Sequence, residues 1–428
     1  MRRLRVLYAP RNIAGQAEAY AHCLRAAGHS AEVWSYGPPA FSFGADRVID
    51  LGRLRADPLH RWQVLDDAVR SFDVIHFQYG RSLVDPDLPE VAPLSDLPLL
   101  WSLDKKLIMN YRGSDVRLKS VHTAREPDSY MRSADVECDE ARIRANVSVA
   151  RRYCDALLVS TPGLLDYVPD AMWLPHVVDT QWWAKRPAAE RTIPRVAHMP
   201  SRRSAKASDV VDRTCRTLSD RGVIEYVPLT GLDRDGVRAA FHAADIVVDS
   251  LTIGDHGLVS VEAMAAGAIA VAHIHERNRD RNPGVPVVEA TVHDLELVLE
   301  GLAADPDRRA ALKRESVDWV RAKHSMEVVG PLLVDLYQRP HRASGLSDPS
   351  FPAVGDDRRI RTLEAEIERL RSVVAPGVVQ LERRSSAERI RDEIALEVVP
   401  RARRIFYRSG AARVVRGVRR RVRRGIGR

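Results

Sequence analysis

The glycine-rich stretch "IGDHGLVSVEAMAAGAIAV" (253–271) combines residue types that could hold a phosphorylated ligand. Gly254 and Gly257 let the backbone approach a ligand closely, so that amides can face phosphate or sugar oxygens. Glu262 is expected in the first turn of the following helix, where the helix dipole favours a carboxylate. Such a carboxylate can also accept hydrogen bonds from a diol such as a ribose. Simple helix capping is the alternative interpretation.

A second candidate is the basic loop "HMPSRRSAKASD" (198–209), which follows a predicted strand and precedes a predicted helix. This position is the carboxyl edge of a sheet, where open α/β sheets bind ligands. Two arginine forks and one lysine suit a diphosphate, and the residues are Arg202, Arg203 and Lys206. A solvated basic loop is the alternative. Gly15, just before the first predicted helix, could admit a phosphate to the helix N-terminus or only ease a turn.

Other chemistries find little support in the sequence. There is no GxGxxG fingerprint, which disfavours a dinucleotide-dependent oxidoreductase, and "STPGLL" is not a nucleophile elbow. The "HIH" triplet at 273–275 could be a metal pair, but it lacks a nearby third ligand, so strand-end histidines are the favoured interpretation. His76, at the end of another predicted strand, could contact an acceptor or pack in the core.

The elements that position these residues alternate between strand and helix patterns, which predicts parallel sheets. Strands are expected at 4–9, 31–36, 73–80, 106–113, 155–161, 171–179, 195–201, 224–231, 244–251 and 285–290. Helices are expected at 208–221 and 233–243, and one ends at Gly28. The prediction is therefore an α/β chain of two Rossmann-like domains, 1–185 and 190–338, joined by a polar linker.

Beyond residue 338 the composition changes. Residues 339–358 read as a linker, and apolar residues at heptad spacing predict a short coiled coil at 359–375, which would permit a homodimer. The extension 376–428 ends in an arginine-rich tail that contains twelve arginines and no acid after Pro400. Since the whole chain has a net charge of +8, the basicity belongs to this tail.

The tail spaces its valines as an amphipathic helix would, which suits an anionic membrane surface. Nucleic-acid binding is the rival interpretation, and a disordered solvated tail is the third. No apolar run is long enough for a membrane span, and four scattered cysteines suit a reducing cytoplasm. We therefore expect a cytoplasmic protein that docks on the inner face of the membrane.

The opening stretch resembles the loop–helix–strand signature of family-four retaining glycosyltransferases of the GT-B fold, E-G-x-G-x-x-x-x-E-A-M-A-x-G-x-P-V-V. The resemblance extends in the same order over residues 4–338, through "GSDVR" (113–117), "STPGLLDYVPDAMWLPHVVD" (160–179), "PSRRSAK" (200–206), "FHAADIVVDSL" (241–251) and "KHS" (323–325). It implies a UDP- or GDP-linked sugar as donor, a glycan or lipid-linked acceptor, and neither a cofactor nor a metal.

The resemblance also implies roles for individual residues. Glu262 would hold the nucleotide ribose, and the basic residues of the loop, Arg202 or Arg203 with Lys206, would neutralise the diphosphate. The loop amides, including those of Gly257, Leu258 and Val259, would face the donor sugar and diphosphate. Base contacts are expected at Thr230, Gly231 and Leu232.

The sequence departs from the family pattern at two places near the reaction centre. The first family glutamate falls on Gly254, which leaves Asp255 or His256 to grip the sugar hydroxyls. The usual histidine of the "HGSD"-like segment is Arg112, with Asn110 two residues earlier. We therefore expect Arg112, Asp255 and His256 to be the catalytic candidates.

Together these features predict a retaining glycosyltransferase of cell-envelope or polysaccharide biosynthesis. The alternative is a catalytically degenerate GT-B protein that acts as a binding or scaffolding subunit. A nucleic-acid binder that uses the basic tail is less favoured.

Overall fold

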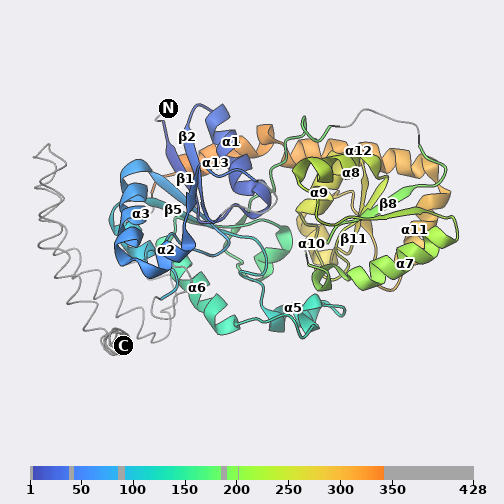
Figure 1. The fold of residues 1–428 in the computed structure, drawn as a ribbon, viewed down its shortest axis with the longest axis horizontal. Helices are drawn as coiled ribbons and strands as arrows, with labels where there is room; N and C mark the ends of the chain where they lie inside the picture. The colour runs from blue at the N-terminus through green and yellow to red at the C-terminus, as the bar shows by residue number, and fades with distance from the viewer. Residues whose placement is uncertain (1–2, 38–42, 85–91, 185–189, 201, 342–428) are drawn as a thin grey trace, which may run out of the picture. The chain divides into compact units, whose positions relative to one another are not determined.

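The computed structural model describes residues 3–37, 43–84, 92–184, 190–200 and 202–341. The predicted coiled coil, the arginine-rich extension and most of the predicted linker at 339–358 lie outside these residues. The described residues form two Rossmann-like halves, each built on its own parallel sheet (Figure 1).

The first half has a seven-stranded sheet in the described residues, in the order β3-β2-β1-β4-β5-β6-β7. Its strands are β1 (Arg5–Ala9), β2 (Ser30–Tyr36), β3 (Arg47–Ile49), β4 (Val74–Gln78), β5 (Lys106–Tyr111), β6 (Ala156–Val159) and β7 (Met172–Trp173). Every neighbouring pair is parallel. The strand order reverses between β1 and β4, and such switch points are where open α/β sheets bind ligands.

The second half has a five-stranded parallel sheet within the part of the chain that is described, in the order β12-β11-β10-β8-β9. Its strands are β8 (Arg195–His198), β9 (Glu225–Pro228), β10 (Ile246–Val248), β11 (Ile269–Ala272) and β12 (Val288–Glu289). The strand order reverses between β8 and β10. Both candidate loops, after β8 and after β10, therefore leave the sheet at its switch point.

Helices cover both faces of each sheet, which explains why β4, β5, β10 and β11 are buried along their whole length. On the first sheet, α1 (Gln16–Ala26) and α13 (Met326–Gln338) cover one face, and α2 (Leu51–Ala56), α3 (Pro58–Ser71), α4 (Leu97–Ser102) and α6 (Glu140–Tyr153) cover the other. On the second, α8 (Arg234–Ala243), α9 (Leu258–Ala265) and α12 (Pro306–His324) lie opposite α7 (Ser208–Asp220) and α11 (Leu295–Ala304).

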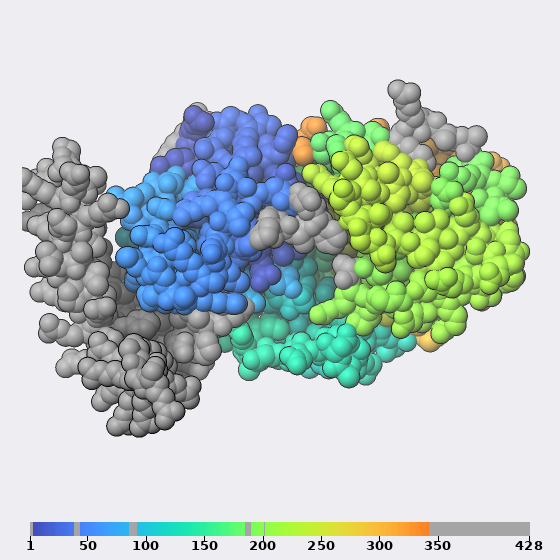
Figure 2. Space-filling view, in the orientation of Figure 1, coloured from blue at the N-terminus to red at the C-terminus, as the bar shows by residue number. Residues whose placement is uncertain are grey.

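A segment of the first half reaches the second half. It contains α5 (Lys119–Arg125) and the 3-10 turn η3 (Tyr130–Arg132), and it lies against the 3-10 turn η5 (Ser204–Lys206). Tyr130 and Met131 form a small apolar cluster with Ala205. Figure 2 shows this segment in teal beside the green surface of the second half.

The domain ranges differ from the prediction at both ends of the second half. The predicted range 190–338 includes α13, but Val329, Leu333 and Tyr337 of this helix are buried in the core of the first half. The apolar face of α13 is evident from sequence, whereas the core that it enters is not. At the other end, Trp183, assigned to residues 1–185, stacks on Phe241 in the core of the second half.

Two local predictions also change. The predicted strand at 171–179 is reduced to Met172–Trp173. Helix α9 begins at Leu258 rather than near Glu262, so Glu262 lies in the second turn of the helix and does not cap it. The glycine at 257 is the N-cap residue, and it has extended backbone angles.

Candidate active site

The first cluster, the α9 cluster, lies at the switch point of the second sheet, around the N-terminus of α9. It consists of Lys206, Asp249, Ser260 and Glu262. Asp249, which follows β10, is buried and forms an ion pair of 2.7 Å with the buried Lys206 Nζ. The same carboxylate accepts hydrogen bonds from the amide and the hydroxyl of Ser260 in α9, at 3.2 and 2.7 Å. Lys206 also donates to the Met199 carbonyl oxygen at 3.1 Å. Asp249 thus ties the basic loop to the helix and fixes Lys206 at its N-terminus.

Glu262 lies one turn beyond Leu258, the first residue of α9. Its side chain is half-buried and has no hydrogen-bond partner among the described residues. Burial raises its pKa to about 8, against the opposing attraction of Arg234 and Lys206. A carboxyl group that is held this way, without a described protein partner, can form hydrogen bonds with hydroxyl groups of a ligand.

The two arginines of the basic loop are arranged differently from Lys206. Arg203 is exposed and forms ion pairs with Asp209 and Asp212 of α7, at 2.7 and 2.8 Å. Arg202 is also exposed, and its charge helps to lower the pKa of Asp135, after the hydrogen bonds from Ser133 and Ser204. The structure therefore brings Lys206 together with Glu262, and it leaves the two guanidinium groups at the surface.

The predicted base-binding turn follows β9 at the edge of the sheet. Thr230 and Gly231 are exposed, and Leu232 packs on the core of the second half. Beside it, the Arg234 guanidinium lies 4.5 Å from the Trp182 ring centroid. The charge of Arg234 also acts on Glu262, which connects this turn electrostatically to the α9 cluster.

Gly15 is separate from the α9 cluster and belongs to the first half. It has a positive φ of 71° and is the N-cap residue of α1. The Phe43 ring covers it closely, since a Cβ at this position would lie 2.6 Å from Phe43 Cδ1. An aromatic ring thus occupies the approach that was predicted for a phosphate.

The three catalytic candidates meet in a second cluster, to which both halves contribute. Asp255 is buried, and it accepts hydrogen bonds from the Gly163 amide of the first half at 2.6 Å and from its neighbour His256. Arg112 lies 3.4 Å from His176 Nδ1 and donates to Gln78. Burial lowers the pKa of His176 well below its usual range, and the charges of Arg112, His324 and His256 lower it further.

A row of buried polar side chains continues from Arg112 along the first sheet. Gln78 and Asn110 are register partners on β4 and β5, and His76 lies two residues before Gln78 on the same face. Several of their atoms have no hydrogen-bond partner among the described residues: His76 Nε2, Gln78 Nε2, Asn110 Nδ2 and Asn110 Oδ1. Burial lowers the pKa of His76 to about 3, so this side chain is neutral. The row therefore places unpaired, uncharged donors and acceptors inside the first half, next to the partly buried Arg112.

Several site residues were missed by sequence reasoning. They are Asp249, Glu126, His176, His324 and Arg117. All but Glu126 lie in segments that carry the family resemblance, which is the signal that could have found them. Arg117 is buried near Asp255, and the one described hydrogen bond of its guanidinium goes to the Tyr130 hydroxyl at 3.4 Å. His324 belongs to the "KHS" segment, and its ring lies 6.3 Å from that of His256.

The histidines of "HIH" are not arranged as metal ligands. His273 lies between two carboxylates, Glu126 at 3.0 Å and Glu289 at 2.6 Å. His275 is the N-cap residue of α10 (Glu276–Arg281), where its ring nitrogen accepts from the Arg277 amide. No group of three or more metal-ligating side chains is found in the described ranges.

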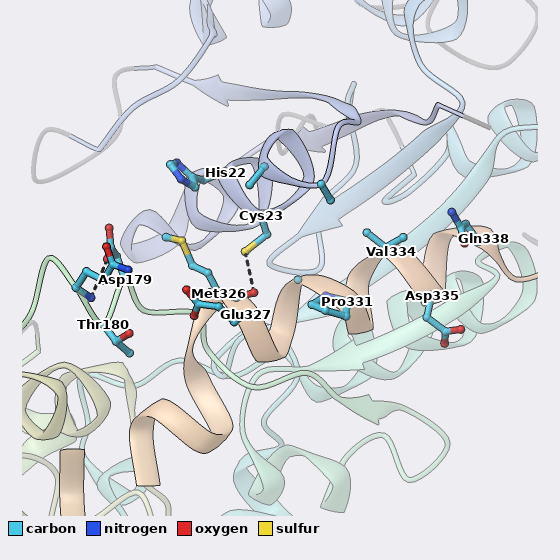
Figure 3. Close-up of a pocket in the computed structure, with 14 residues that line it drawn as sticks. His22, Cys23, Asp179, Thr180, Met326, Glu327, Pro331, Val334, Asp335 and Gln338 are labelled. Carbon is cyan, nitrogen blue, oxygen red and sulfur yellow. Dashed lines mark hydrogen bonds between the residues drawn. The ribbon is translucent and has the colours of Figure 1, made fainter. Parts of the chain in front are cut away.

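Away from both clusters, a groove of about 710 Å³ runs between α1 and α13 (Figure 3). His22 and Cys23 of α1 face Met326 and Pro331 of α13, and Asp179 lies at one end. None of the residues of the two clusters line this groove.

The described helices include none with the length and hydropathy of a membrane span.

Three comparisons with known proteins complete the description. No protein-family model matches the sequence, and no curated protein matches it. Solved structures do match. Sucrose-phosphate synthase (tll1590) from Thermosynechococcus elongatus aligns with a TM-score of 0.54 at 15% identity, over 78% of this chain and 98% of that chain.

Anabaena Alr3699/HepE in complex with UDP and glucose gives a TM-score of 0.54 at 11% identity, over the same shares of the two chains. The catalytic domain of starch synthase IV from Arabidopsis thaliana, bound to ADP and acarbose, gives a TM-score of 0.52 at 12% identity, over 79% of this chain and 99% of that chain. These likenesses confirm the predicted GT-B fold of two Rossmann-like halves.

Proposed function

We propose that this protein is a retaining glycosyltransferase that moves a sugar from a nucleoside-diphosphate donor to an acceptor hydroxyl. One observation carries the proposal: Glu262, a carboxylate without a described partner, lies one turn beyond an α9 N-terminus where Lys206 is fixed. Amides and an ammonium suit a diphosphate, and the carboxylate suits the hydroxyls of a ribose. Two proteins of similar fold were solved with UDP and with ADP, which supports the proposal.

In the proposed reaction, the bond between the sugar and the diphosphate breaks, and the diphosphate leaves with the electron pair. Lys206 and the amides at Leu258 and Val259 stabilise the negative charge that develops on it. The acceptor hydroxyl comes from the side of the first half, where Arg112 and the buried polar row offer hydrogen bonds. It attacks on the face that the diphosphate leaves and passes its proton to the departing diphosphate oxygen, so the new glycosidic bond forms on that face and the configuration is retained. The scheme uses no metal and no resident cofactor.

The α9 cluster is tested by binding rather than by turnover alone. Glu262→Ala should weaken the affinity for the nucleoside diphosphate that stabilises the wild type, chosen from UDP, GDP and ADP, by about tenfold in calorimetry. Glu276→Gln, which changes an exposed carboxylate at the start of α10, serves as the matched control. Equal affinities for the wild type and Glu262→Ala would remove the assigned site.

A second candidate function, a binding or scaffolding subunit without activity, is favoured by one observation. Lys206 and Arg203 are already paired with carboxylates, so the charge available to a diphosphate is smaller than the sequence indicates. A thermal-shift screen of nucleotide sugars distinguishes the two functions, because a donor should stabilise the folded state by mass action. Failure of every nucleotide sugar to bind would favour the subunit.

The biological setting is also a proposal. The acceptor is a glycan or lipid-linked molecule of cell-envelope or polysaccharide biosynthesis, and the arginine-rich tail docks on an anionic membrane from the cytoplasm. The heptads at 359–375 support a homodimer. Flotation with anionic liposomes, with and without residues 400–428, tests the membrane contact, and equal flotation of the two proteins would contradict it.

A further inference from the structure

Glu126, from the first half, occupies the space beside Gly254 of the second half. Gly254 has a φ of 73°, and a Cβ on it would lie 2.1 Å from Glu126 Oε1 and 2.6 Å from Glu126 Cδ. No side chain at position 254 could coexist with the carboxylate in this place. The glycine is therefore required both by its backbone conformation and by the close approach of Glu126.

The carboxylate is held by one of its two oxygens. Glu126 Oε2 lies 3.0 Å from His273 Nε2, and the other ring nitrogen of His273 lies 2.6 Å from Glu289. Glu126 Oε1 has no hydrogen-bond partner among the described residues, although the side chain is more than nine-tenths buried. Because Oε1 keeps some contact with solvent at the edge of this mostly buried side chain, it can accept a hydrogen bond from a donor outside the protein.

The segment that carries Glu126 is fixed on the loop 253–256, which precedes α9. His122, one turn earlier on α5, lies 2.5 Å from the Ser129 hydroxyl and 3.2 Å from the Ile253 carbonyl oxygen. Ile253 directly precedes Gly254. Because His122 fixes Ile253 next to Gly254, the contact between Glu126 and Gly254 is held in place by neighbouring hydrogen bonds.

We propose that Glu126 determines donor-sugar specificity by accepting, at Oε1, a hydrogen bond from a hydroxyl of the transferred sugar. This inference rests on the proposed function of the α9 cluster. The charges along the loop assign the two parts of the donor to different groups. The amides and Lys206 suit the diphosphate, whereas the Glu126 carboxylate repels phosphate and suits a neutral sugar hydroxyl. A buried group that hydrogen-bonds a substrate hydroxyl rejects analogues that lack it.

The test separates the sugar from the nucleotide. Glu126→Gln and Glu126→Ala are compared with the wild type for binding of UDP, GDP and ADP and of the matching glucose and mannose conjugates. We expect both variants to lose about tenfold or more in affinity for the preferred nucleotide sugar, and to bind the free nucleoside diphosphate within about twofold of the wild type.

Asp128→Asn is the matched control, because Asp128 also contacts a histidine of the second half, His293, at 3.0 Å. That contact is exposed and does not touch the loop, so this variant should bind both ligands as the wild type does. Equal losses for nucleotide and nucleotide sugar in Glu126→Gln, or no loss for either, would overturn the specificity role. No nucleotide binding by the wild type would instead overturn the proposed function, and this inference with it.

Gly254→Ala, alone and combined with Glu126→Ala, gives a second test, and the single variant does not depend on the stability of Glu126→Ala. Gly254→Ala places a methyl group against the carboxylate and should reduce nucleotide-sugar binding in the same selective way. In the Glu126→Ala background the same methyl group meets no carboxylate, so it should add only the cost of its backbone conformation. Additive effects of the two substitutions on nucleotide-sugar binding would contradict a shared site.

Discussion

At the scale of single residues, the donor-side cluster depends on one buried ion pair. Asp249 and Lys206 are both nearly inaccessible, and the pKa of Asp249 is lowered by the nearby Lys206 despite its burial. Removing one partner of a buried pair leaves the other charge without compensation. The ion pair therefore fixes the position of Lys206 more than it stabilises the folded state.

Asp249→Asn should lower the free energy of unfolding by about 3–5 kcal/mol, because it leaves the Lys206 ammonium buried and unpaired. The double variant Asp249→Asn/Lys206→Met should recover most of this loss and still fail to bind a nucleoside diphosphate. Urea unfolding and calorimetry measure the two effects. A double variant as unstable as Asp249→Asn would show that the carboxylate acts mainly through Ser260.

Glu262 gives a second prediction at this scale, which concerns pH. Its pKa is raised from an ordinary 4.5 to about 8, so the folded state keeps a proton that the unfolded state releases. The free energy of unfolding should therefore fall as the pH rises from about 4.5 to 8, by on the order of 1–3 kcal/mol after allowance for partial exposure. Glu262→Gln should show a shallower fall between pH 5 and 8 in urea unfolding. Parallel pH curves for the two proteins would contradict the assigned shift.

At the scale of elements, α13 links the end of the described chain to the first sheet. Its apolar face packs with α1 and β1, and the Tyr337 hydroxyl lies 2.6 Å from His76 Nδ1 and 3.0 Å from the Tyr8 hydroxyl. The helix thus completes the face of the sheet that carries the buried polar row. Figure 1 shows it in orange beside the blue α1.

Leu333→Ala should destabilise the protein by about 2–5 kcal/mol, because Leu333 is fully buried in the core of the first half. The neighbouring Leu332 is 49% exposed on the same helix, and Leu332→Ala should change stability by less than about 0.5 kcal/mol. Amide exchange should locate the weakening in β1 and β4. Weakening confined to the second half would contradict the packing of α13.

At the scale of the whole molecule, the two halves meet through charged side chains around the 253–256 loop. Asp166 of the first half lies 2.7 Å from Arg281 and 3.4 Å from Arg277, both of α10. His273 joins Glu126 of the first half to Glu289 of the second. These contacts, with the hydrogen bond from the Gly163 amide to Asp255, hold the 253–256 loop against the first half.

Hydrogen bonds to Glu126 and Glu289 raise the pKa of His273 to about 9. The stabilisation by its positive charge is therefore complete below about pH 6.5 and is lost as the pH rises through 9. We expect amide exchange in the segment 119–132 to accelerate by roughly fivefold or more between pH 6.5 and 9, after correction for intrinsic exchange, and to lose this dependence in His273→Gln.

His293→Gln is the control for this contact, because His293 is 75% exposed and its pair with Asp128 should contribute little. It should keep the pH dependence of the wild type. The same dependence in His273→Gln would show that another group holds the segment.

The sequence by itself indicated most of the strands and helices and the two Rossmann-like halves, because hydrophobic periodicity and glycine positions are local signals, but it missed the short strand β3. It also placed Lys206 and Glu262 at a sheet edge, since strand ends in parallel sheets converge. Only the tertiary structure decided that Asp249 neutralises Lys206, that α13 belongs to the first half, and that Glu126 fills the space at Gly254. These contacts join residues far apart in the chain, and their geometry depends on packing that no local pattern encodes.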